Sequence, residues 1–96
     1  MIVYVSIGNS DDKLSQQEWS RFYGSVSVEL SSAARSVHGQ WQSLPSSPFQ
    51  NACWCIEVSN SDAAGLKALL AEIAKEFEQD SIAWAEAPVT EFIESI

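Results

Sequence analysis

The chain has 96 residues, which favours one domain over residues 1–96, because two cores of half this size would bury too little apolar surface. Hydrophobic residues make up 46% of it, and four Trp, four Phe and two Tyr exclude an intrinsically disordered composition. Five basic and 13 acidic residues give a net charge of −8. This sign argues against direct binding to nucleic acid, which needs Lys and Arg to neutralise phosphates.

The first half of the sequence predicts a strand followed by a helix. Residues 2–7 are β-branched and aromatic, and they stop at Gly8, which is typical of a strand entering a turn. Ser15 and Glu18 have the spacing of a capping box, so we expect a helix from there to about Ser36. Its apolar stripe, at spacings of three and four, is Trp19, Phe22, Tyr23, Val26, Leu30, Ala33, Ala34 and Val37.

The second half predicts two more strands around a second helix. Residues 37–44 alternate irregularly and lead into a proline-containing loop at 45–48. Residues 51–58 alternate as a strand, a second helix begins after the N-cap residues 59–62, and residues 81–87 form the last strand. Pro88 ends this strand, and the tail 89–96 is either a short edge strand or a docked extension.

The order of these elements indicates the fold. Strand, helix, strand, strand, helix, strand is the ferredoxin-like βαββαβ pattern of the α+β class. We therefore expect an antiparallel four-stranded sheet with two helices on one face. The last strand would lie at an edge, and the other face of the sheet would be open to solvent or to a partner.

Two cysteines and the single histidine suggest a possible metal site. If the loop at 45–48 closes a hairpin, Cys55 lies opposite Gln40 and Glu57 lies opposite His38, so that His38, Cys53 and Cys55 share a face. Three ligands make an incomplete zinc set, and the CxxC spacing is absent. The alternative is that the cysteines act as small hydrophobes and that His38 is hydrogen-bonded to Glu57.

The loop at 8–13 lies between a strand and a helix, where α/β enzymes often bind phosphate. It lacks the glycine pattern of a P-loop, although Asp11 and Asp12 could hold a divalent cation. Turn formation and helix initiation explain the same residues without a ligand. We predict no metal and no cofactor, and we assign no catalytic residue.

The acidic residues are concentrated in the second half of the chain. Residues 1–50 carry four acids and three bases, a net charge of −1, whereas residues 51–96 carry nine acids and two lysines, a net charge of −7. We predict an acidic strip for binding a partner, with Trp84 or Phe92 as an apolar anchor. The acids of this strip are Glu72, Glu76, Glu78, Asp80, Glu86, Glu91 and Glu94. The alternative is a solvated face that only confers solubility.

Three segments carry a resemblance to known proteins. At residues 4–14, 51–55 and 80–88 the chain resembles small uncharacterised proteins of phages and mobile elements. In being small, acidic and without an evident active site, it also resembles anti-CRISPR proteins, some of which occupy the nucleic-acid-binding surfaces of CRISPR complexes. This resemblance implies an inhibitor that binds protein, and it brings no catalytic residue with it.

Together these observations predict a cytoplasmic, non-enzymatic protein that binds a basic protein surface. The partner would be a nucleic-acid-binding complex; we expect no direct contact with nucleic acid or membrane, and a monomer or weak dimer. One alternative is a ligand- or metal-binding, enzyme-like domain that uses the loop at 8–13. Another is a structural module that dimerises through the open sheet face.

Overall fold

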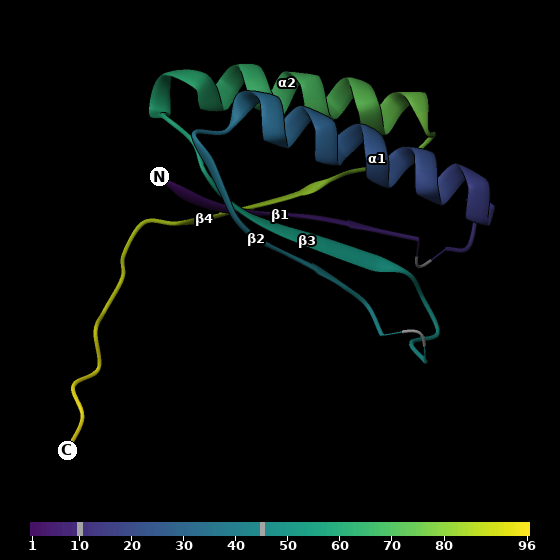
Figure 1. The fold of residues 1–96 in the computed structure, drawn as a ribbon. Helices are drawn as coiled ribbons and strands as arrows, with labels where there is room; N and C mark the ends of the chain where they lie inside the picture. The colour runs from purple at the N-terminus through teal and green to yellow at the C-terminus, as the bar shows by residue number, and fades with distance from the viewer. Residues whose placement is uncertain (10, 45) are drawn as a thin grey trace.

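The structure, a computed structural model, describes residues 1–9, 11–44 and 46–96. Its sheet has the strand order β2-β3-β1-β4, with every pair antiparallel, so β4 is an edge strand (Figure 1). The predicted α+β ferredoxin-like fold is confirmed. The elements in chain order are β1 (Ile2–Gly8), α1 (Gln16–Ala33), β2 (Ser36–Gln42), β3 (Asn51–Glu57), α2 (Asn60–Glu76) and β4 (Ala83–Ala87).

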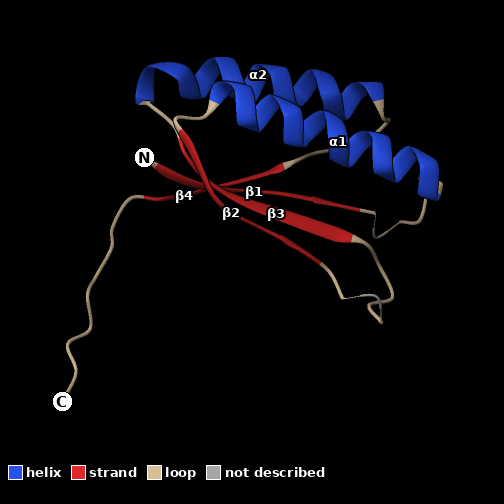
Figure 2. Ribbon diagram, in the orientation of Figure 1, coloured by secondary structure: helices blue, strands red, loops and turns tan. Residues whose placement is uncertain are grey.

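Both helices lie on one face of the sheet, and the core fills the space between these two layers (Figure 2). Side chains alternate between the two faces of a strand, so β1 buries Val3, Val5 and Ile7 toward the helices. In β3 the core positions include Trp54, which is 2% exposed and packs 5.3 Å from the ring of Tyr23. The opposite face has no helix over it in the described part of the chain.

The capping box that begins α1 is confirmed. The Ser15 hydroxyl accepts a hydrogen bond from the Glu18 amide at 3.1 Å, and the Glu18 carboxylate accepts one from the Ser15 amide at 3.0 Å. Phe22, Val26 and Leu30 are the fully buried members of the predicted apolar stripe. In α2, the Ser59 hydroxyl caps the Asp62 amide at 3.2 Å, and the buried residues are Ala63, Leu66, Leu70 and Ala74.

The first helix ends earlier than the sequence pattern indicated. Ala34 has extended dihedrals, and the amide of Arg35 donates to the Glu57 carbonyl at 2.8 Å, so the chain joins the sheet there. Val37 is therefore a residue of β2 and not of the helical stripe, and this part of the prediction is wrong. Pairing with β3 replaces the helical hydrogen bonds that further turns would have made.

The register of the β2–β3 hairpin also differs from the predicted one. Gly39, and not Gln40, lies opposite Cys55, and Ser36 lies opposite Glu57. The pairing shifts between Val37 and Gly39, which leaves His38 as the extra residue of a β-bulge. A bulge inserts one residue into one strand only, so counting from the loop cannot detect it.

The last strand is shorter than predicted, since it begins at Ala83 instead of residue 81. The tail 89–96 is neither an edge strand nor docked, because it has no regular structure and is exposed throughout. Within the predicted loops at 8–13 and 45–48, Ser10 and Pro45 lie outside the described residues. None of the helices in the described residues is long and apolar enough to span a membrane.

We expect Ser15→Ala to lower the free energy of unfolding by about 1 kcal/mol, because the Glu18 amide loses its acceptor at the start of α1. Chemical denaturation of both proteins at neutral pH measures this difference. Ser32→Ala, an exposed change in the last turn of the same helix, is the control and should leave the midpoint nearly unchanged. An equal loss in both variants would contradict the capping role.

The capping box also predicts a pH dependence. Hydrogen bonds from the backbone and side chain of Ser15 lower the pKa of Glu18 below its ordinary value of 4.5. A lowered pKa means that the folded state prefers the ionised form, so this contribution is complete above pH 4.5 and is lost as the pH falls further. Glu18→Gln keeps a hydrogen-bonding side chain but cannot ionise. Its stability should therefore fall less steeply below pH 4.5 than that of the wild type, and identical acid-denaturation slopes would contradict this account.

Candidate partner-binding surface

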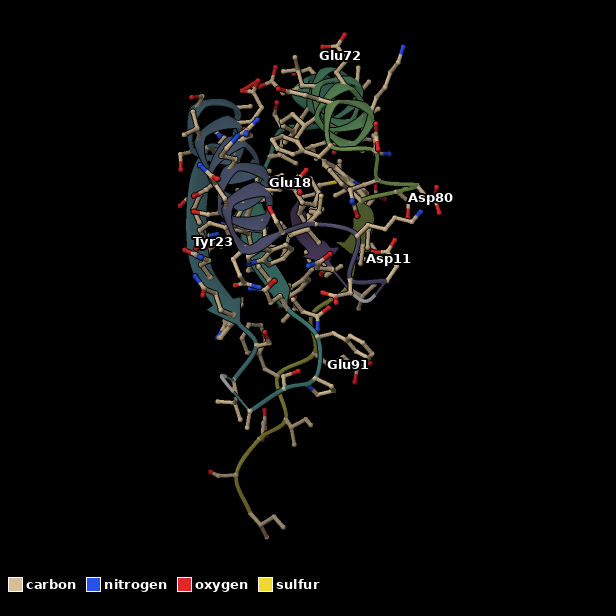
Figure 3. The ribbon with its side chains drawn as sticks, turned by 90° about the vertical axis from the view of Figure 1, so that its right-hand side faces the viewer. Asp11, Glu18, Tyr23, Glu72, Asp80 and Glu91 are labelled. Carbon is tan, nitrogen blue, oxygen red and sulfur yellow. The ribbon has the colours of Figure 1, made fainter. Side chains whose placement is uncertain are left out.

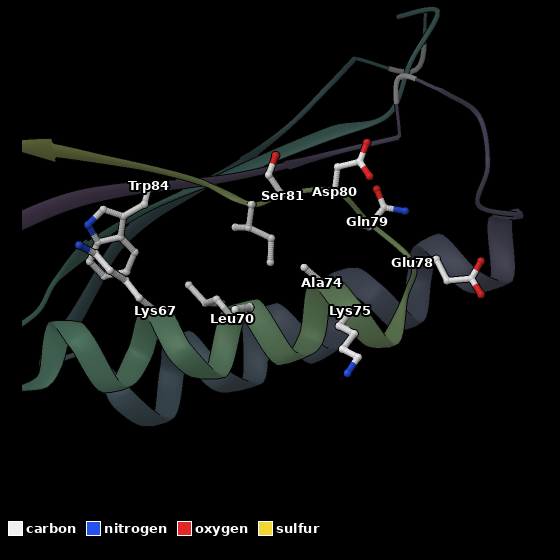
Figure 4. A pocket seen from close by; sticks show the side chains of 11 residues that line it. Lys67, Leu70, Ala74, Lys75, Glu78, Gln79, Asp80, Ser81 and Trp84 are labelled. Carbon is white, nitrogen blue, oxygen red and sulfur yellow. The ribbon is translucent and has the colours of Figure 1, made fainter.

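A cleft of about 740 Å³ separates α2 from β4 and the segment that joins them (Figure 4). It exists because β4 pairs with β1 only from Ala83 onward, so residues 77–82 cross from the end of the helix to the sheet without strand pairing. Leu70, Ala74 and Ile82 supply its apolar lining. The remaining lining residues are Lys67, Ala71, Lys75, Glu78, Gln79, Asp80, Ser81 and Trp84.

Trp84 stands at one end of this cleft and is held by polar neighbours. Its indole N–H donates to the Glu86 carboxylate at 3.2 Å, and the Lys67 ammonium lies 5.1 Å from the centre of the indole ring. Lys67 also lies 3.7 Å from Glu86. Exposed pairs of this kind add little stability. Their effect is to orient the half-buried indole across the cleft toward α2 (Figure 4).

Two acids of the predicted strip lie on the outer side of α2. Glu72 points away from the sheet (Figure 3), and Glu76 follows one helical turn later on the same side. Both side chains are exposed, and the described residues place no cation within ion-pair distance of either one. They are therefore available to a partner that approaches from the helical side of the molecule.

Glu78 and Asp80 lie at the far end of the cleft, where α2 ends. Glu78 has a φ of 55°, a left-handed conformation that glycine usually adopts at the end of a helix. Asp80 shares a hollow of about 370 Å³ with Asp11, which comes from the loop after β1. Sequence reasoning missed this approach of Asp11. The topology contained the signal, because β1 ends at the same end of the sheet at which antiparallel β4 begins.

The structure brings together only part of the acidic strip. Glu72, Glu76, Glu78 and Asp80 surround the second half of α2 and its end. Glu86 lies apart from them, paired with Lys67 and hydrogen-bonded to the Trp84 indole. Lys75 also interrupts the acidic surface, although its ammonium points away from β4 (Figure 4). The other predicted members lie on the exposed tail, away from the cleft: Glu91, Phe92 and Glu94.

The loop at 8–13 uses its polar groups to support its own shape. Asn9 is 2% exposed, and its side chain donates to the Leu14 carbonyl and accepts from the Leu14 amide at 3.0 and 3.1 Å. The carboxylate of Asp11 accepts from the Lys13 amide and lies 3.6 Å from the Lys13 ammonium. These contacts favour the turn interpretation over a phosphate or cation site.

The residues of the suggested zinc site lie on the open face of the sheet. Cys53 and Cys55 are free thiols. The His38 ring lies 3.9 Å from the Glu57 carboxylate, which is near it as the alternative interpretation expected but too far for a hydrogen bond. A hydrogen bond from the Met1 ammonium is the main cause that lowers the pKa of Glu57, and the charge of His38 adds to it. Within residues 1–9, 11–44 and 46–96, no three His, Cys, Asp or Glu side chains are grouped to hold a metal ion.

A similar protein of known function would indicate a role for the cleft. No family model and no curated protein matches the chain. The function of the surface around α2 therefore has to be argued from its own residues.

We expect Glu78→Gly to raise the free energy of unfolding by roughly 0.5–1 kcal/mol, because glycine adopts the left-handed conformation without a clash of Cβ. Thermal unfolding at neutral pH measures the gain. The control is Gln79→Gly at the next position. Gln79 is not among the residues with positive φ, so glycine should destabilise the folded protein there. A loss of stability in Glu78→Gly would show that the glutamate side chain is needed for folding.

Proposed function

We propose that this chain binds a basic surface of another protein and so blocks the nucleic acid that this surface would otherwise hold, as a phage-type inhibitor would. The cleft between α2 and β4 carries the proposal. Acidic residues alone would only give solubility. The cleft combines an apolar middle with polar and charged residues, among them Lys67 beside Trp84 at one end and the carboxylates of Glu78 and Asp80 at the other. An apolar centre with polar surroundings is the composition of a specific protein interface.

Each part of the cleft has a role in this model. An apolar side chain of the partner packs between Leu70, Ala74 and Ile82, against the indole of Trp84. Lys or Arg residues beside it meet Glu78 and Asp80 at the other end of the cleft. Glu72 and Glu76 extend the negative potential along the outer side of α2, which accelerates association and makes it sensitive to salt.

The edge of the sheet gives further support to this role. In the described part of the chain, β4 has a strand neighbour on one side only, so its outer edge has backbone groups free for pairing. An extended segment of the partner can add a strand there while its side chains enter the cleft below. A stretch of alternating apolar and basic residues fits both the pairing and the charge of this site.

The test is a charge reversal with a matched control. Glu78→Lys and Asp80→Lys together should lower partner affinity at least about tenfold. Glu91→Lys and Glu94→Lys change the net charge equally, on the tail away from the cleft, and should retain most of the binding. Immobilised chains would be used to capture proteins from a bacterial lysate, with elution at about 1 M NaCl, where the Debye length is about 3 Å.

The eluted proteins are then assayed for nucleic-acid binding with and without the wild-type chain added. The proposal expects captured basic proteins whose nucleic-acid binding is inhibited by the wild type and not by the cleft variant. Equal capture by both double variants would reduce the effect to bulk charge and overturn the proposal. Capture without inhibition of nucleic-acid binding would contradict the blocking role. Circular dichroism of each variant verifies that it is folded.

A further inference from the structure

The central rows of the sheet face opposite the helices are uncharged and lack a cover in the described residues. Two rows cross it in register, Trp41–Cys53–Ser6–Ala83 and Gly39–Cys55–Tyr4–Ala85, and neither row contains a charged residue. Trp41 is 56% exposed and Tyr4 is 41% exposed. Glu57 and His38 lie beyond these two rows, at the margin of the same face. In a chain with a net charge of −8, two neighbouring uncharged rows with two exposed aromatic rings are typical of a protein contact.

This face, named the open face here, contains a hollow of about 430 Å³ beside Trp41. Ser6 and Cys53 lie at its floor. The indole of Trp41 lies over Gly39, so closely that a Cβ at residue 39 would come within 2.9 Å of the ring. An aromatic wall beside a floor of small residues accommodates a large apolar side chain.

The tail 89–96 provides side chains of this kind. It leaves the end of β4 and extends away from the body of the molecule (Figure 1). Val89, Phe92, Ile93 and Ile96 are each at least 74% exposed, and their spacing of three, one and three residues puts them on one side of a helix. Thr90, Glu91, Glu94 and Ser95 would lie on the other side. The tail is thus an amphipathic segment without a partner in the described structure.

A helical tail does not bring Phe92 to Trp41 of its own chain. From Ala87, which pairs with Ile2, the row of Trp41 lies three strands across and four residues along the sheet. These steps amount to about 14 Å and about 13 Å, or roughly 19 Å in all. Phe92 in a helix would lie only about 8 Å beyond Ala87. A helical tail that packs Phe92 against Trp41 therefore comes from another molecule.

We propose that two copies of the chain form a two-fold dimer in which the tail of each copy coils into a short helix on the open face of the other. Phe92 then occupies the hollow beside Trp41, and Glu91 and Glu94 stay in solvent. The tail leaves one corner of the sheet, and Trp41 lies at the opposite corner. A two-fold axis that lies in the interface, along the other diagonal of the sheet, places the tail corner of each copy over the Trp41 corner of its partner. Two segments of this length bury less than the roughly 1,600 Å² of a standard interface, so the dimer is weak.

Sedimentation equilibrium over about 1 μM to about 1 mM chain tests the dimer. The wild type should shift from monomer to dimer within this range. Trp41→Ser, and separately Phe92→Ser with Ile93→Ser, should each raise the dissociation constant at least about tenfold. Val28→Ser removes an exposed apolar side chain from α1 and should leave the constant unchanged. A wild type that stays monomeric, or a tail variant that dimerises like the wild type, would overturn the proposal.

Disulfide trapping shows which molecule the tail contacts. Under a mild oxidant, Ile93→Cys should form a disulfide with Cys53 of a second copy and run as a covalent dimer on a non-reducing gel. Thr90→Cys, on the polar side of the tail helix, should give far less dimer. Monomers only, with or without an internal disulfide, would contradict the exchange of tails. The tail variants should still bind a partner through the cleft, so failure of the dimer leaves the proposed function intact.

Discussion

The pairing of β1 along both of its edges is the constraint on which the rest of the structure depends. Seven residues pair with β3 on one side, and five pair with β4 on the other. Because β1 is central, its alternation determines which face of the whole sheet is buried. Val3 and Val5 are completely buried beneath the helices, while Tyr4 between them is 41% exposed on the open face. A one-residue slip would exchange these faces.

The difference in length between β1 and β4 produces the cleft. β1 pairs with β3 as far as Gly8, but its pairing with β4 stops at Ser6, opposite Ala83. The segment after α2 therefore crosses a gap beside β1 that no strand of the described residues fills. Trp84 and Ile82 project into this gap from the same side of the chain. Trp84, which the sequence indicated as an anchor, therefore lies beside an apolar lining. Its side chain is half-buried there and is not enclosed in the core.

Charge and apolar surface are segregated on this molecule. The central rows of the open face carry no charged side chain, whereas the outer side of α2 and the end of the helix carry carboxylates. Two surfaces of such different character suit two different contacts. The acidic surface attracts partners over a Debye length, while the open face acts only at contact through burial of apolar area. Salt should therefore weaken contacts of the acidic surface and leave contacts of the open face largely unchanged.

The sequence by itself determined the order of the elements, the fold class and the capping box, because these depend on local spacing and hydrogen bonding. It also indicated Trp84 as an anchor. Only the tertiary structure decided where α1 ends, where the bulge at His38 shifts the hairpin, and which acids share a surface. These features depend on pairing between segments far apart in the chain. Asp11 lines the same hollow as Asp80, and Lys67 pairs with Glu86, because of the sheet topology, which the spacing of residues along the chain does not encode.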